Sequence, residues 1–185
     1  MTGNSKTAWG WPAKLLHWIA AILILLLLGH GWWMTHMAAR PDRLANYAGH
    51  AALGYDLLAL LILRLLWRWT HVVPDLPDDL ERWERIAARA SHIGLYLFML
   101  ASTLTGWALA GTFRDALNKD VFNLTVPSIF ISQERPMHVM LENTHKVLSH
   151  LLAALVVVHI AGALRHQFIK HNDVLRRMWF GTKAT

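Results

Sequence analysis

Four apolar stretches, each long enough to cross a lipid bilayer, dominate this chain of 185 residues. They cover about residues 15–34, 49–69, 93–112 and 147–168. A transmembrane helix needs about 20 mostly apolar residues to cross a hydrocarbon core about 30 Å thick, and each stretch meets that requirement. Backbone in lipid must satisfy its own hydrogen bonds, so the spans should be helical. The sequence therefore predicts an all-α fold: an integral membrane four-helix bundle in which residues 1–185 form one domain.

The composition agrees with a membrane protein and excludes several kinds of site. Only 16% of the residues are charged, against about 25% in soluble domains. The net charge of +6 does not indicate nucleic-acid binding, because the basic residues lie at the ends of the apolar stretches. The absence of Cys excludes disulfides, thiolate zinc sites, iron–sulfur clusters and the covalent attachment of c-type haem. Twelve His leave imidazole as the main candidate metal ligand.

The distribution of Lys and Arg orients the four spans. One side, formed by both tails and the second connection, carries twelve basic residues, and the other side carries six. The twelve are Lys6, Lys14, Arg64, Arg68, Arg82, Arg85, Arg89, Arg165, Lys170, Arg176, Arg177 and Lys183, and the six are Arg40, Arg43, Arg114, Lys119, Arg135 and Lys146. Basic residues concentrate on the cytoplasmic side, so we expect both termini to be cytoplasmic in a multi-pass protein of the bacterial inner membrane. The connection 74–89 resembles a short interfacial helix, and the connection 113–144 would face the periplasm.

Two histidines of the fourth span, His145 and His159, are separated by about four helical turns. At about 100° and 1.5 Å per residue, they share one helix face to within about 40° and lie about 21 Å apart. One metal ion cannot use both, but two stacked cofactors can, and haem iron takes axial His. In the expected orientation, His50 lies at the depth of His145, and His17 lies at the depth of His159. The sequence thus predicts two bis-His sites, each between two helices.

Other residues near these depths leave alternatives open. Arg64, about four turns after His50, is either a partner for a haem propionate or an Arg that snorkels to the interface. Gly31, which follows His17 by the same interval, either lets a macrocycle approach or mediates ordinary helix packing. His92 is the strongest rival to His17, whereas His30 lies about 140° from the face of His17. The connections and tails hold further histidines that we expect at the surface: His36, His71, His138 and His171.

The order and spacing of several motifs resemble the bacterial cytochrome b561 family over about residues 14–178. The motifs are Leu16-His17-Trp18, His50 with Gly54 and Arg64, His92 to Tyr96, Leu124-Thr125-Val126-Pro127, His145 with His159, and Asn172 to Met178. The resemblance implies a four-helix inner-membrane protein that holds two b haems, with His17, His50, His145 and His159 as axial ligands. It also implies electron exchange with ubiquinone. The activity that it implies is a superoxide:ubiquinone oxidoreductase, with superoxide oxidised at the periplasmic face.

The expected mechanism is sequential one-electron transfer. A small diffusible reductant such as superoxide would meet the haem of His50 and His145, and electrons would then pass between haems or directly to quinone. Basic side chains near that face would concentrate an anionic donor or simply be solvated loop charges: Arg114, Lys119, Arg135 and Lys146. Bis-His ligation leaves no open coordination position, which favours outer-sphere transfer over oxygen activation.

The chief alternative is a cytochrome b anchor subunit that passes electrons from a hydrogenase- or formate dehydrogenase-type partner to quinone. The lack of an extended soluble tail or a further span favours a self-contained protein, for which no obligate protein partner is expected. A carrier of metal ions or a non-redox structural membrane protein is a further alternative. Both would be colourless, whereas a haem protein is red.

Overall fold

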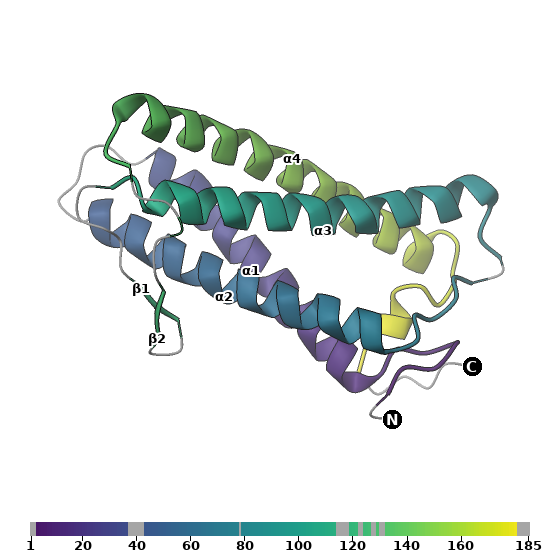
Figure 1. Ribbon diagram of the computed structural model, residues 1–185. Coiled ribbons are helices and arrows are strands. Elements are labelled where there is room, and N and C mark those ends of the chain that lie inside the picture. The colour runs from purple at the N-terminus through teal and green to yellow at the C-terminus, as the bar shows by residue number, and fades with distance from the viewer. Residues whose placement is uncertain are drawn as a thin grey trace.

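The computed structural model describes seven parts of the chain: residues 3–36, 43–77, 79–113, 119–121, 124–126, 129 and 132–180. The described residues form four long helices, which are α1 (Trp11–Thr35), α2 (Arg43–Thr70), α3 (Arg82–Ala110) and α4 (Arg135–Phe168) (Figure 1). All four are long and apolar enough to cross a membrane. The prediction of an all-α four-helix membrane protein is therefore confirmed.

Two small elements accompany the bundle. Strands β1 (Lys119–Val121) and β2 (Leu124–Val126) form an antiparallel hairpin in the connection between α3 and α4. A single 3-10 turn, η1 (Arg176–Met178), lies in the C-terminal tail. The family motif expected at 124–127 thus contributes β2, and its Pro127 lies outside the described residues.

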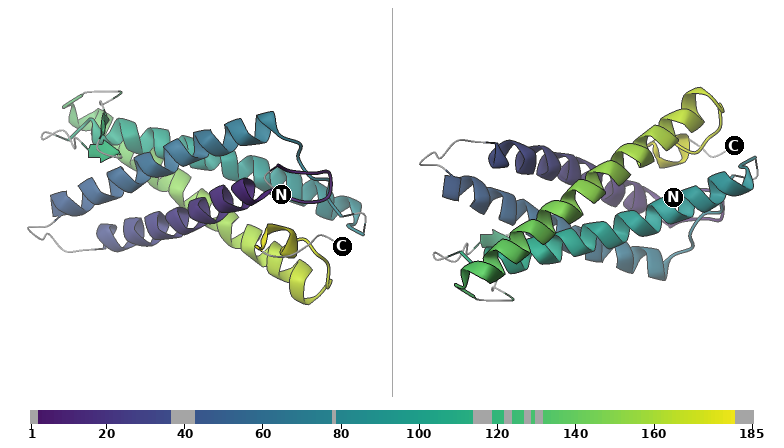
Figure 2. Two further views of the ribbon diagram at one scale, coloured as in Figure 1. Left: turned by 90° about the horizontal axis from the view of Figure 1, so that it is seen from below. Right: turned by 90° about the horizontal axis from the view of Figure 1, so that it is seen from above.

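The helices pack in chain order, α1 on α2, α2 on α3 and α3 on α4. Figure 2 shows that α4 runs obliquely across the other helices. Both termini lie at one end of the bundle (Figure 1), which we call the terminal end and which holds Trp11, Thr70, Arg82 and Phe168. The opposite end, which we call the hairpin end, holds the β-hairpin and the first turns of α4.

α3 begins earlier than the hydropathy pattern predicts. The separate interfacial helix expected within 74–89 is not found among the described residues, because its second half forms the first turns of α3. A capping box fixes this start: the Glu81 side chain accepts from the third backbone N–H of the helix, and the Glu84 side chain accepts from the Glu81 N–H at 3.0 Å. Such a box satisfies two backbone donors that would otherwise lack partners.

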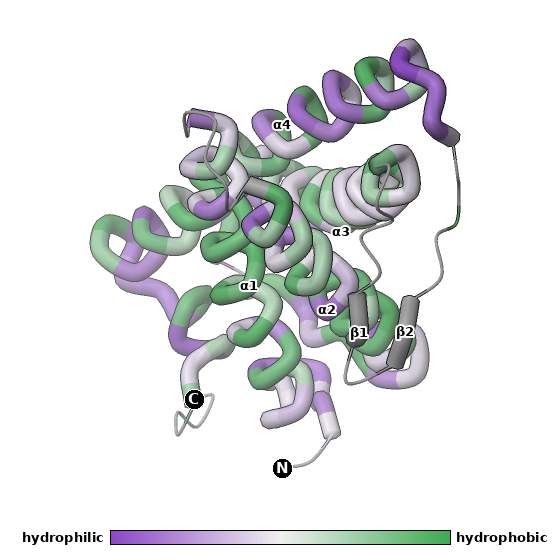
Figure 3. Tube along the Cα trace, turned by 90° about the vertical axis from the view of Figure 1, so that its left-hand side faces the viewer, coloured by the Kyte–Doolittle hydropathy of each residue, from purple (hydrophilic) through white to green (hydrophobic). Residues whose placement is uncertain are grey.

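α4 also extends beyond its predicted span. It begins at Arg135, with Pro136 in its first turn, and not near Val147. Its 34 residues are about 51 Å long at 1.5 Å per residue, which exceeds a hydrocarbon core of about 30 Å. The first turns of α4 are strongly hydrophilic, as the purple colour in Figure 3 shows. A search for apolar stretches therefore misses them.

Ile24, Leu57 and Leu152 form an apolar layer in the middle of the bundle. All three are buried and belong to one core cluster. On α4, Leu152 lies midway between His145 and His159. Ile24 and Leu57 hold the corresponding midpoints of α1 and α2. Each half of this interval is about 10 Å of helix, so the apolar layer lies at the same distance from each of the two predicted sites.

The two tails close the terminal end. The Lys14 side chain donates to the Trp179 carbonyl at 2.7 Å, and the Trp18 indole donates to the Met178 carbonyl at 2.8 Å. On the other side of this end, Lys170 forms an ion pair with Glu81 at 2.9 Å. The C-terminal tail is thus tied to α1 and to the start of α3.

Candidate cofactor sites

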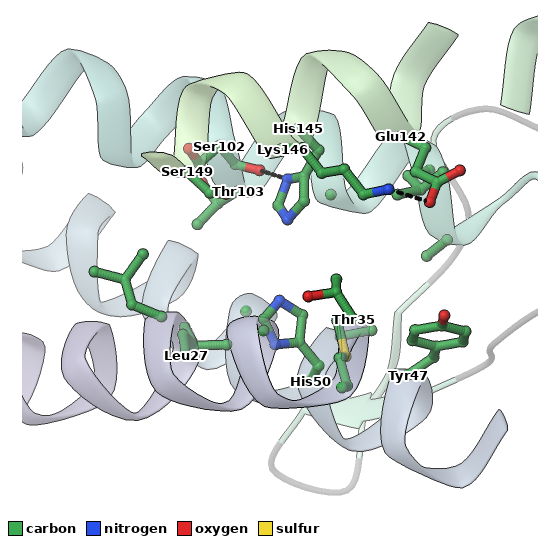
Figure 4. A pocket seen from close by; sticks show the side chains of 18 of the residues that line it. Leu27, Thr35, Tyr47, His50, Ser102, Thr103, Glu142, His145, Lys146 and Ser149 are labelled. Carbon is green, nitrogen blue, oxygen red and sulfur yellow. Dashed lines mark hydrogen bonds and ion pairs between the residues drawn. The ribbon is translucent and has the colours of Figure 1, made fainter. Parts of the chain in front are cut away.

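The first site lies at the hairpin end, where His50 of α2 and His145 of α4 face each other across a cavity (Figure 4). Their ring centroids are 6.2 Å apart, and the ring planes meet at 85°. The cavity has a volume of about 760 Å³ and takes lining residues from all four helices, down to the apolar layer. Cofactor pockets in proteins usually have about 300–1,000 Å³, so this cavity has the size of a prosthetic-group site.

Hydrogen bonding orients His145 for metal binding. Its Nδ1 donates to the Ser102 carbonyl at 3.0 Å. A proton held on Nδ1 leaves the lone pair of Nε2 free for a metal, and such contacts are the usual support of a metal-bound His. His50 differs, because its buried Nδ1 has no hydrogen-bond partner among the described residues.

Two glycines leave space beside the imidazole rings of His50 and His145. A Cβ at Gly31 would lie 3.3 Å from His50 Cε1, and a Cβ at Gly106 would lie 3.0 Å from His145 Cε1. The structure places Gly31 against the His50 ring, a contact that neither interpretation of Gly31 had predicted. Gly106 was missed by the sequence reasoning. It follows His92 by the same interval by which Gly31 follows His17, and that spacing could have revealed it.

The second site lies nearer the terminal end, between His17 of α1 and His159 of α4. Their ring centroids are 6.4 Å apart with an interplanar angle of 70°. The Arg64 Nη2 donates to His17 Nδ1 at 2.9 Å, and the Arg64 guanidinium lies 5.4 Å from the centre of the Tyr96 ring. Arg64 therefore points into the bundle at the depth of this pair, and no carboxylate of the described residues forms an ion pair with it.

Both pairs have the spacing of axial ligands. An iron ion bound by two imidazole nitrogens at about 2 Å each places the two ring centroids about 6 Å apart. The separations of 6.2 Å and 6.4 Å agree with that value. No group of three or more His, Cys, Asp or Glu side chains in the described part of the chain is arranged to hold a bare metal ion. The residues present thus fit a group with two axial positions.

Each pair has a third histidine beside it. The His92 ring lies 5.4 Å from the His159 ring, and the His30 ring lies 5.8 Å from the His50 ring. These separations are shorter than those of the two opposed pairs. The His30–His50 separation is as near to about 6 Å as the His50–His145 separation, so ring spacing does not distinguish these rivals from the predicted ligands.

The rim of the cavity corrects the prediction about His138, whereas His36 is exposed as predicted. His138 lies in the first turns of α4, not in a connection, and both His138 and His36 line the cavity. His138 contacts Thr112 at 2.6 Å. Lys146 also lies at this rim and forms an ion pair with Glu142 at 2.7 Å (Figure 4).

Among the remaining basic residues named for the donor face, Arg135 is the one whose side chain the structure describes. Arg135 is exposed at the start of α4. Arg114 lies outside the described residues, as does the side chain of Lys119. Lys146 is therefore the member of that group that the structure places beside His145.

Comparisons with known proteins agree with this arrangement. The model of a family described as prokaryotic cytochrome b561 matches residues 8–181. Cytochrome b561 homolog 2 of Escherichia coli (strain K12) is 27% identical over 183 residues, which are 95% of this chain and 93% of that protein. Cytochrome b561 homolog 1 of the same strain is 25% identical over 171 residues, with 88% and 92% covered.

Proposed function

Because this chain belongs to the prokaryotic cytochrome b561 family of haem b electron-transfer proteins in bacterial membranes, we propose that it holds two haem b groups. One would be bound by His50 and His145, and the other by His17 and His159. The observation that carries this proposal is the pair of ring separations, 6.2 Å and 6.4 Å, at two levels of α4.

The surrounding residues support this assignment. The Ser102 carbonyl holds the proton of His145 on Nδ1, and Gly31 and Gly106 leave space beside the rings. The Arg64 guanidinium supplies a cation for a propionate, which an Arg fork binds well. A bound haem b supplies one-electron redox chemistry. Each haem would be held by the two imidazoles of its pair, so donors would give electrons without binding to iron.

We propose superoxide as the donor and ubiquinone as the acceptor. If both termini are cytoplasmic, the hairpin end would face the periplasm, with the Lys146–Glu142 ion pair beside the cavity. Two superoxide ions would each lose one electron and become dioxygen. One ubiquinone would take up the two electrons and two protons to become ubiquinol.

We further propose that the chain acts as a single domain without an obligate protein partner. An anchor subunit of a hydrogenase- or formate dehydrogenase-type complex is not favoured, because the family match is to cytochrome b561 proteins over 8–181. Membrane lipid and quinone are then the expected partners.

Haem content tests the assignment. Purified wild-type protein should contain two haems per chain and give a reduced-minus-oxidised spectrum of bis-His haem b. His145→Ala and His159→Ala should each hold one haem. His171→Ala, in the tail after α4 and outside the cavity lining, is the control and should keep two. Unchanged haem content in His145→Ala would refute the assignment.

The substrates need a second measurement. Anaerobic mixing of the oxidised protein with superoxide should reduce the haems, and added ubiquinone should reoxidise them with formation of ubiquinol. Haem reduction by superoxide without any ubiquinol would leave the haem assignment intact and refute the acceptor.

A further inference from the structure

Asp56 is an acidic side chain inside the membrane-spanning helix α2. It lies between His50 and Arg64 in the sequence, about 9 Å below His50 along the axis. Its carboxylate forms no hydrogen bond or ion pair with any residue that the structure describes. An ionisable group at such a depth is costly and normally has a function. Neither the sequence reasoning nor the two cofactor sites account for it.

The Asp56 side chain lies on the outer face of α2. Positions one heptad apart share a helix face to within about 20°, so Gly49, Asp56 and Leu63 form one stripe. Gly49 and Leu63 are exposed, and Asp56 is half-buried. The cavity is lined by Tyr55 and Leu57 on either side of Asp56, but not by Asp56 itself. The carboxyl group therefore lies outside the His50–His145 cavity, on the stripe of α2 that carries the exposed Gly49 and Leu63.

A group in this position meets molecules that are dissolved in the hydrocarbon core. Ubiquinone is such a molecule, its carbonyl oxygens accept hydrogen bonds, and its reduction consumes two protons. A carboxyl group can donate both a hydrogen bond and a proton. We propose that Asp56 binds a ubiquinone carbonyl at the outer face of α2 and donates one of the two protons.

This inference rests on the proposed function, which supplies the electrons. Two superoxide ions give two electrons and leave as dioxygen. Ubiquinone takes those electrons, one proton from the Asp56 carboxyl group and one from water, and Asp56 then regains its proton from water. Electrons cross only α2, about 10 Å in diameter, between the cavity and the Asp56 face.

A series at one position separates proton donation from binding. Asp56→Asn keeps a hydrogen-bond donor but no acid, so it should lower kcat for reduction of a short-chain ubiquinone at least tenfold with little change in KM. Positioned general acids contribute about 10²- to 10⁴-fold. Asp56→Glu should recover part of kcat. Asp56→Leu should raise KM as well, while its thermal stability stays equal or increases because a costly group leaves the lipid face.

Leu63→Asn is the matched control, because it adds an amide on the same stripe, 55% exposed in the wild type. It should leave kcat and KM unchanged. Haem content and the rate of haem reduction by superoxide should be the same in all variants. Binding of an unreactive short-chain ubiquinone analogue should weaken in Asp56→Leu and not in Leu63→Asn.

Several outcomes would overturn the proposal. One is an unchanged kcat in Asp56→Asn, and another is equal losses in Asp56→Asn and Leu63→Asn. Loss of self-association in Asp56→Leu with normal ubiquinol formation would instead identify a helix–helix contact. If wild-type haems are reduced but no ubiquinol forms, the quinone part of the proposed function fails, and the role of Asp56 fails with it.

Discussion

Substituting Gly106 should weaken haem binding at the hairpin end without unfolding the protein. A Cβ at this position would lie 3.0 Å from His145 Cε1 and 3.3 Å from its Nδ1. Carbon atoms pack best at about 3.5–4.0 Å, so Gly106→Ala must displace the ring by about 0.5 Å. The hydrogen bond from His145 to the Ser102 carbonyl is 3.0 Å long, and this displacement would stretch it to the edge of hydrogen-bond geometry.

The expected loss follows from these two effects. Overpacking costs about 1–3 kcal/mol, and a lost hydrogen bond costs about 0.5–1.5 kcal/mol. A total of about 1.5–4.5 kcal/mol corresponds to about 10- to 2,000-fold weaker haem binding. Gly31→Ala should have a smaller effect, below about tenfold, because its Cβ would lie 3.3 Å from His50, whose Nδ1 has no described partner to lose.

Gly49→Ala is the matched control on the helix that carries His50. A Cβ at Gly49 meets nothing within 4 Å, Gly49 does not line the cavity, and Ala stabilises a helix by about 1 kcal/mol over Gly. The variants are compared by the rate of haem loss to an excess of a haem-scavenging protein. We expect Gly106→Ala to lose one haem fastest, then Gly31→Ala, and Gly49→Ala to match the wild type. Equal losses in Gly49→Ala and Gly106→Ala would refute the reasoning, as would wild-type retention in Gly106→Ala.

Two further predictions concern the other end of the bundle. Arg64→Leu removes the guanidinium proposed as the partner of a haem propionate, and a hydrogen bond to a charged group is worth about 1.5–3 kcal/mol, so one haem should dissociate roughly ten- to 100-fold faster. Arg68→Leu, one turn later, is the control, and equal retention in both variants would exclude a role for Arg64. The hydrogen bond from Lys170 lowers the pKa of Glu81. This contact therefore stabilises the folded state fully at pH values above the usual glutamate pKa, and the stabilisation is lost as the pH falls through the lowered pKa. Thermal unfolding followed against pH should therefore show a weaker acid dependence in Glu81→Gln, and identical pH profiles would argue against the contact.

Much of the site could be predicted because a helix in a membrane has a regular rise and a fixed direction. Counting residues from the ends of the spans was enough to place His50 opposite His145 and His17 opposite His159. The predicted spacing of about four turns between the two depths is kept in the structure because α1, α2 and α4 are each continuous helices through both depths. The pairing of the proposed ligands could therefore be predicted without knowledge of side-chain packing.

The missed features depend on information that hydropathy does not contain. The first turns of α3 and α4 are polar, and their helical state comes from the Glu81–Glu84 capping box and from Pro136 in the first turn of α4. Gly106 matters only because α3 packs closely on α4 beside His145. Asp56 was visible as a carboxylate in an apolar stretch, but its outward direction required the positions of the neighbouring helices.

The apolar layer of Ile24, Leu57 and Leu152 has an electrical consequence. Its three side chains offer no group that carries a proton, so charge would pass this level of the bundle as electrons alone. The two sites are about 21 Å apart in a hydrocarbon core of about 30 Å, so an electron moving between them would traverse about two-thirds of the membrane field. Moving one charge across the full membrane field is worth about 2.3 kcal/mol for each 100 mV. The membrane voltage would therefore change the free energy of electron transfer between the two sites by about 1.5 kcal/mol per 100 mV. The protein would then act as a voltage-sensitive element of the membrane, poised differently in energised and de-energised cells.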